Sequence, residues 1–332
     1  MVYYDNDTIL AVKNFSAGFT SDSGVLKAVD NISFNLKKGE TLGIVGESGC
    51  GKSVTALSIM KLLPVPSGQY ISGEILYKNR NILQMSKADL AETRGSRIAM
   101  IFQEPMTALN PVQPVGKQLA EVFHLHKKEM TTSKIINESL KLLQKVGIPE
   151  PEQRLKEYPH QLSGGMRQRV MIAMALACKP DILIADEPTT ALDVTIQAQI
   201  LDLIKNLQSE TGMSVIFITH DLGVIAQLCD NVIVMYAGRI AESASVKSLF
   251  ANPMHPYTRG LFAAIPRFEY KRKTRLKSIE GMVPSLAEYP IGCRFQNRCP
   301  LVFEKCYEKQ PEAVEAGENH LVYCYRSGEN YE

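Results

Sequence analysis

The strongest constraint on this chain is a glycine-rich run that follows a strand-like segment, TLGIV, and precedes a helical one, VTALSIMKLL. The run fits the pattern G-x-x-x-x-G-K-[ST] and consists of Gly46, Glu47, Ser48, Gly49, Cys50, Gly51, Lys52 and Ser53. Glycines allow successive backbone N–H groups to surround phosphate oxygens, and the following helix adds the positive end of its dipole. The lysine can neutralise terminal phosphates and the serine can bind Mg²⁺. The run therefore predicts a nucleotide site; the alternative, a plain glycine turn, does not explain the flanking strand and helix.

Strand-like and helical segments alternate over most of the sequence. RIAMIFQ, DILIAD, SVIFIT and DNVIVMY are apolar runs typical of buried parallel strands, whereas MRQRVMIAMALACK and TIQAQILDLIKNLQSE have helical spacing. GEILYKNRNI has the pattern of a hairpin, and SLKLLQKVGI that of a helix capped by Gly147. This alternation predicts an α/β fold with a parallel sheet covered on both faces, into which a helical stretch is inserted.

Composition and length exclude several classes of protein. The 332 residues exceed what one hydrophobic core usually supports, so we expect a large domain, residues 1–255, followed by a smaller extension, residues 256–332. Lys and Arg total 37 against 35 Asp and Glu, a balance that argues against nucleic-acid binding through bulk charge. The longest apolar run, VMIAMALAC, is far shorter than the ~20 residues of a membrane span, and the N-terminus lacks an apolar signal core. We therefore expect a cytosolic protein.

The apolar run ILIAD ends in one acidic residue, and a second acidic residue begins the turn that follows it. Carboxylates at the end of a buried strand are costly unless a cation or a proton-transfer role compensates. Asp186 is therefore expected to hold Mg²⁺ through water, and Glu187 to act as the general base for an attacking water. A strand that ends in an acidic surface turn is the alternative.

A second segment combines a serine and two glycines before a helix. Ser163, Gly164 and Gly165 open MRQRVMIAMALAC and form a second candidate anion site at a helix N-terminus. Two such sites far apart in one chain suggest a nucleotide site that is completed across a dimer. A simple cap and turn is the alternative.

These motifs, in this order, resemble the nucleotide-binding subunits of ABC transporters, with LSGGMRQR as signature and ILIADEP as the acidic strand. The resemblance extends to Gln103 in IFQEP, to Asp193 after Ala191 and Leu192, and to His220 in ITHD. Phe19 matches the aromatic residue that stacks on adenine in the family. The matching region covers about residues 8–255.

The resemblance implies a P-loop NTPase core of the ABC ATPase type, with an antiparallel β subdomain and an inserted helical subdomain at about residues 104–160. Two such subunits would sandwich two ATP molecules, each held by Phe19, by the glycine-rich run and by the next residue, Val54. Mg²⁺ would lie near Ser53, Gln103 and Asp186, and Glu187, His220 and Gln103 would serve hydrolysis. The opposite subunit would contribute Ser163, Gly164, Gly165 and Asp193.

Three further segments, TALNP at residues 107–111, NPMHPYT at 252–258 and GCRFQNRCP near the C-terminus, resemble the dipeptide and oligopeptide importers. That branch also includes importers of nickel and glutathione. The resemblance implies a peripheral ATPase on the cytoplasmic side of the cell membrane. Its partners would be two transmembrane permease subunits and, indirectly, an extracellular solute-binding protein. A second ABC ATPase subunit would complete the complex; a homologous heterodimer is expected, and a homodimer is the alternative. No nucleic acid is expected. A soluble ABC ATPase without a transport role is disfavoured by the single cassette and the short insertion.

Four of the seven cysteines crowd into the C-terminal extension: Cys293, Cys299, Cys306 and Cys324. In a reducing compartment such a cluster favours a metal site over disulfides. Four thiolates can complete a tetrahedral Zn²⁺ site or hold an iron–sulfur cluster, and the absence of C-x2-C pairs favours the cluster. The tail also resembles a [4Fe-4S] module of peptide importers. Zinc and four free thiols are the alternatives.

Overall fold

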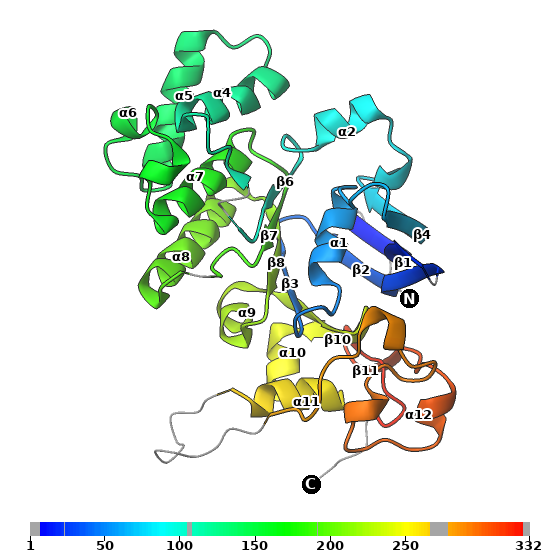
Figure 1. Cartoon of the computed structure of the whole chain (residues 1–332). Helices are drawn as coiled ribbons and strands as arrows, with labels where there is room; N and C mark the ends of the chain where they lie inside the picture. The colour runs from blue at the N-terminus through cyan, green and yellow to red at the C-terminus, as the bar shows by residue number, and fades with distance from the viewer. Residues whose placement is uncertain (1–6, 23, 105–107, 191, 266–277, 328–332) are drawn as a thin grey trace. The chain divides into compact units, whose positions relative to one another are not determined.

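The computed structural model describes residues 7–22, 24–104, 108–190, 192–265 and 278–327 (Figure 1). The chain forms two compact units. The first contains Met1–Asn35, Thr41–Leu83 and Ile218–Glu332, and the second contains Leu36–Glu40 and Gln84–Phe217. Thr107 and Ala191, which belong to two of the motifs identified in the sequence, lie outside the described residues. The domain boundaries expected from the sequence stay predictions.

The first unit contains a four-stranded antiparallel sheet with the order β2-β1-β4-β5. Its strands are β1 (Thr8–Ser21), β2 (Gly24–Lys37), β4 (Gly68–Tyr77) and β5 (Arg80–Asn81). Tyr77 pairs with Arg80 across a two-residue turn in which Lys78 and Asn79 have φ values of 46° and 64°. Left-handed residues match the twist of paired strands, so the hairpin predicted from GEILYKNRNI is confirmed.

A second set of strands in the first unit runs in the order β11-β12-β10-β9-β3. The strands are β3 (Thr41–Val45), β9 (Asn231–Tyr236), β10 (Arg239–Ser245), β11 (Val314–Gly317) and β12 (His320–Val322). β3 is parallel to β9, whereas β10 is antiparallel to both of its neighbours. Every residue of β3 is buried, as its unbroken apolar sequence predicts.

The helices of the first unit are α1 (Lys52–Ile59), α9 (Leu222–Leu228), α10 (Val246–Ala251), α11 (Pro256–Ala263) and α12 (Lys305–Glu308). An aromatic cluster joins this unit's strands to its C-terminal part. The ring of Tyr236 on β9 lies 4.7 Å from that of Tyr257 and 5.1 Å from that of Phe295. Tyr257 and Phe295 therefore share one hydrophobic core with β9 and β10.

The second unit contains β6 (Ile98–Ile101) and β7 (Ile182–Asp186), which are parallel, and β8 (Ser214–Thr219), whose last two residues belong to the first unit. Its helices are α2 (Lys87–Thr93), α4 (Val115–His126), α5 (Thr132–Lys145), α6 (Pro151–Arg154), α7 (Gly164–Leu176) and α8 (Val194–Thr211). Helices α4, α5 and α7 pack together around Phe123, Ile135 and Ala177 (Figure 1). Helix α5 ends before Gly147, which has a φ of 75° as expected of a C-terminal cap.

The predicted α/β class is confirmed, although the sheet that contains β3 and β9 is mixed rather than purely parallel because β10, β11 and β12 add antiparallel strands. Within the described part of the chain, no helix combines the length and the apolar character that crossing a bilayer requires.

Candidate functional site

The glycine-rich run forms a loop between β3 and α1 in the first unit, as predicted. Two of its glycines are required by their surroundings. A Cβ on Gly46 would lie 2.2 Å from the carbonyl oxygen of Met235, and Gly51 has a φ of 102° with the Ala28 carbonyl oxygen 2.8 Å from a Cβ built there. Any larger residue at either position would displace the loop from the neighbouring backbone.

Lys52 lies at the start of α1 and is only 5% exposed. Its Nζ donates hydrogen bonds to the carbonyl oxygens of Gly46 at 2.7 Å and Glu47 at 3.1 Å. The amine is thus held across the loop by the loop's own backbone. The residue before the helix, Gly51, provides no side-chain cap, so the first backbone N–H groups of α1 receive no acceptor from it. A cation and a helix N-terminus together form a site suited to an anion.

Two other residues of the predicted nucleotide site belong to the first unit. Phe19 lies near the end of β1, pairs with Gly68 and is half-buried. His220 follows the buried strand β8 and is exposed. Stacking on a base by Phe19 and contact with a phosphate by His220 stay predictions.

The second unit brings two predicted catalytic residues into contact. Gln103 follows β6, Glu187 follows β7, and the Gln103 Nε2 donates to Glu187 Oε2 at 3.2 Å. Asp186, the last residue of β7, is 4% exposed. Glu187 has a φ of 46°, an unfavourable backbone conformation for a non-glycine residue. Strain of this kind is typical of residues held in place for function.

A third residue at this position was not anticipated from the sequence. Thr190 donates from its Oγ1 to the same Glu187 Oε2 at 2.9 Å, and its backbone N–H donates to the Glu187 carbonyl at 3.2 Å. A threonine three residues after an acid has no distinctive sequence signal, but the turn between β7 and α8 returns it to the carboxylate. Gln103 and Thr190 thus orient the Glu187 carboxylate through two hydrogen bonds to the same oxygen.

The residues predicted to contact nucleotide across a dimer begin two helices of the second unit. The Ser163 hydroxyl accepts a hydrogen bond from the Met166 N–H at 3.3 Å and caps α7. The Asp193 carboxylate accepts from the Ile196 N–H at 3.0 Å and caps α8. Gly164 and Gly165 form the first turn of α7. The capping role considered for Ser163 is therefore present in the structure; it is compatible with a further contact to an anion.

The four C-terminal cysteines converge although they are spread over more than thirty positions of the sequence. Cys293, Cys299, Cys306 and Cys324 line one narrow cavity, and none forms a disulfide. Burial raises the pKa of Cys293 to about 12 and that of Cys299 to about 11, and repulsion between the ionised thiols adds to both shifts. Without a cation the Cys293 and Cys299 thiols are therefore neutral at physiological pH.

The predicted metal site is not supported by the structure. In the described ranges, no group of three or more His, Cys, Asp or Glu residues could hold a metal ion. Four thiols that line one cavity are a donor set that suits a metal group, but their arrangement among the described residues does not form a metal-holding group. Sequence spacing could not reveal this, because it gives the order of the cysteines and not their separation.

Comparison with known proteins assigns this arrangement to a family. The sequence model of the family "ABC transporter" matches residues 29–190, and that of "Oligopeptide/dipeptide transporter, C-terminal region" matches residues 241–306. The chain is 52% identical to the dipeptide transport ATP-binding protein DppD of Bacillus subtilis, with 96% of this chain and 95% of the relative covered. The chain belongs to the ABC transporter family.

Other relatives and solved structures agree with the assignment. The probable peptide ABC transporter ATP-binding protein y4tR of Sinorhizobium fredii is 53% identical, over 97% of this chain and 96% of the relative. The oligopeptide transport ATP-binding protein OppD of B. subtilis is 48% identical, over 95% and 87%. Among solved structures, the ATP-binding cassette MJ0796, a dimer bound to ADP and phosphate, superposes with a TM-score of 0.64 at 28% identity over 71% of this chain and 98% of that chain. The ABC ATPase fold predicted from the motifs is thus confirmed.

Proposed function

We propose that this ABC protein binds and hydrolyses ATP to power the import of dipeptides or oligopeptides. The observation that carries the hydrolytic part is the contact of Gln103 and Thr190 with Glu187, because it presents one oriented carboxylate directly after the buried acid of β7. The peptide substrate is supported by the match of residues 241–306 to a peptide-transporter region and by the names of the full-length relatives.

In this proposal each residue of the predicted nucleotide site has a role in binding or hydrolysis of ATP. The N–H groups from Gly46 to Val54 and the Lys52 ammonium bind the phosphates, and Phe19 stacks on the adenine. Ser53, Gln103 and Asp186 would hold Mg²⁺, which neutralises phosphate charge when bound. Glu187 orients the attacking water and accepts its proton, while His220 contacts the terminal phosphate. Gln103 holds the Glu187 carboxylate in position throughout.

The proposal includes a dimer of ATPase subunits. Ser163, Gly164, Gly165 and Asp193 would reach the nucleotide bound by a second subunit, where a serine hydroxyl and helix N–H groups can bind the terminal phosphate. The dimeric solved relative supports such an assembly. A homologous second subunit and a second copy of this chain are both compatible with these residues.

The remaining partners follow from the importer role. We propose that residues from about 104 to 160 receive two permease subunits on the cytoplasmic side of the membrane, and that a solute-binding protein delivers peptide outside the cell. The test is to purify the complex from membranes, reconstitute it in vesicles and measure ATP-dependent uptake of a labelled dipeptide. Competition by unlabelled tripeptide supports a peptide importer, whereas competition by Ni²⁺ or glutathione alone contradicts it.

For the cysteine cavity we propose a [4Fe-4S] cluster rather than zinc. The proposal is supported by the four thiols that line one cavity, a donor set that an iron–sulfur cluster requires, and by the absence of C-x2-C pairs in the sequence. Protein purified without oxygen should absorb near ~400 nm and lose the band on oxidation. Colourless protein that contains stoichiometric zinc, or no metal, contradicts the proposal.

A further inference from the structure

Two side chains of the C-terminal region hold Glu47, the second residue of the phosphate loop. The Arg298 guanidinium donates to both carboxylate oxygens of Glu47, Nη1 to Oε2 at 2.7 Å and Nη2 to Oε1 at 3.1 Å. The Tyr257 hydroxyl accepts a hydrogen bond from the Glu47 backbone N–H at 2.9 Å. Both the side chain and the backbone of this loop residue are therefore fixed by residues more than two hundred positions away.

Arg298 is itself held rigidly. Its side chain is 4% exposed, and its Nε donates to the Glu280 carbonyl at 2.9 Å. Its guanidinium carbon lies 5.7 Å from the centre of the Tyr236 ring, within the range of a cation–π contact. Tyr257 is fully buried against the rings of Tyr236 and Phe295. Both groups are thus oriented before they meet the loop, which is the condition for positioning another residue.

The position of Glu47 bears directly on Lys52. The carbonyl oxygens of Gly46 and Glu47 are the acceptors of the Lys52 ammonium. A shift of Glu47 therefore moves both the amine and the backbone N–H groups that face the phosphates. Since Gly46 already contacts the Met235 backbone, the loop has little freedom to compensate.

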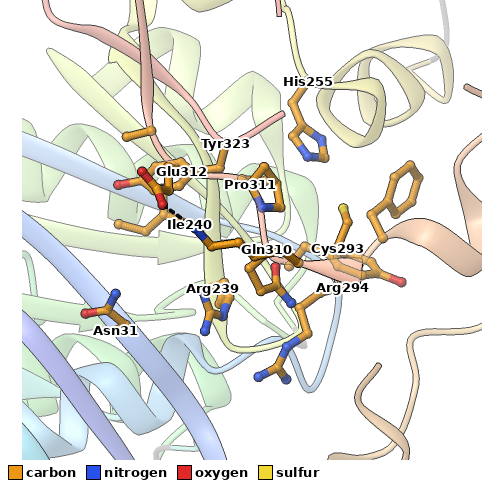
Figure 2. Close-up of a pocket in the computed structure, with 15 residues that line it drawn as sticks. Asn31, Arg239, Ile240, His255, Cys293, Arg294, Gln310, Pro311, Glu312 and Tyr323 are labelled. Atoms are coloured by element: carbon orange, nitrogen blue, oxygen red, sulfur yellow. Dashed lines mark hydrogen bonds and ion pairs between the residues drawn. The ribbon is translucent and has the colours of Figure 1, made fainter. Parts of the chain in front are cut away.

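The segment that carries Arg298 is anchored at a second point. Arg294, which follows Cys293, donates to Asp30 Oδ2 at 2.8 Å, an oxygen that also accepts from Arg239 at 2.6 Å. Figure 2 shows Cys293 and Arg294 side by side on the wall of a pocket, with Arg239 nearby. Arg294 and Arg298 lie on the cysteine-bearing segment and bind two different parts of the first unit, so the segment is fixed relative to the loop.

We infer that Arg298 is a positioning residue for nucleotide binding, which acts through Glu47 to hold the phosphate loop in its binding geometry. The inference rests on the proposed function in one respect, namely that this loop binds MgATP. Without the pair, the loop N–H groups and the Lys52 ammonium would no longer be held in their binding geometry, so loss of the pair is expected to raise the Kd for MgATP by about tenfold or more.

The test is a double-mutant cycle on the full chain, with MgATP titrated by calorimetry and folding followed by circular dichroism. Arg298→Gln and Glu47→Gln should each weaken binding by about tenfold, and the double variant should bind no more weakly than either single variant. Arg298→Lys keeps the positive charge but loses the two parallel hydrogen bonds of the guanidinium, so its Kd for MgATP should lie between those of the wild type and Arg298→Gln. Lys309→Gln is the control, since it removes an exposed ion pair with Glu312 in the same region and should leave the Kd within about twofold.

Each outcome is decisive. If the wild type does not bind MgATP, the proposed function fails and this inference fails with it. If the wild type binds MgATP and both single variants bind it as tightly as the wild type, only the inference fails. If the two effects multiply in the double variant, Arg298 acts independently of Glu47 and the inference is overturned. If Arg298→Gln does not fold, Glu47→Gln, which leaves the other contacts of Arg298 intact, decides by itself.

Discussion

Glu187 is the residue in which sequence and geometry agree most closely. It follows a buried strand, has a left-handed backbone and is contacted by two donors. If it is the general base, Glu187→Gln should lower ATP turnover by about 10²–10⁴-fold and leave MgATP binding intact, since the amide retains shape but cannot accept a proton. Phosphate release and equilibrium nucleotide binding measure the two effects. Glu210→Gln, which removes a half-exposed carboxylate on α8, is the control; unchanged turnover of Glu187→Gln would remove the assignment.

Thr190 allows a finer test at the same site. Its hydroxyl orients the Glu187 carboxylate and makes no other contact that the proposal uses. Thr190→Val keeps the shape and removes the donor, so kcat should fall by about three- to tenfold with little change in the KM for ATP. Thr190→Ser, which keeps the hydroxyl, should restore most of the rate. A rise in KM at constant kcat would indicate a role in binding instead.

At the scale of elements, helix α11 depends on a neutral histidine. His255 is 3% exposed and caps the helix, with its Nδ1 accepting from the Tyr257 N–H at 3.0 Å. Burial lowers the pKa of His255 to about 4, whereas nearby Glu242 raises it. Because the unfolded chain keeps a pKa of about 6.5, it binds a proton first as the pH falls, and the free energy of unfolding should decrease between about pH 6.5 and 4.

The size of this effect follows from the two pKa values. The contribution of His255 to the free energy of unfolding of the wild type should be about 2 kcal/mol lower at pH 5 than at pH 7. His255→Asn can still cap the helix but does not titrate. Its free energy of unfolding should therefore change between pH 7 and pH 5 by that amount less than the wild type's. Urea unfolding at the two pH values measures it. An equal pH dependence of the two proteins would show that His255 does not carry the effect.

The sequence predicted local elements better than contacts between distant ones. The phosphate loop, the Gly147 cap and the hairpin at Lys78 and Asn79 could be recognised from residues close in the chain, because glycine content and apolar spacing indicate the local backbone. The Arg298–Glu47 pair and the shared cavity of the cysteines depend on tertiary packing. An arginine beside a cysteine carries no local signal for a partner in a loop, so only the folded arrangement reveals such contacts.

At the scale of the whole molecule, the proposed dimer gives Ser163 an effect that appears only on assembly. Its hydroxyl caps α7, a role that asparagine and aspartate fill equally well. Ser163→Asn and Ser163→Asp should therefore both fold. Both should bind MgATP normally as isolated chains, because Ser163 would contact only nucleotide that is bound to a second subunit.

In the assembled complex Ser163→Asp should lower ATP turnover by more than about tenfold, since its charge would face the terminal phosphate. Ser163→Asn, matched in size and capping but neutral, should retain more activity. Weaker MgATP binding by the isolated aspartate variant would contradict a contact made across the dimer, because the repulsion would then arise within one chain.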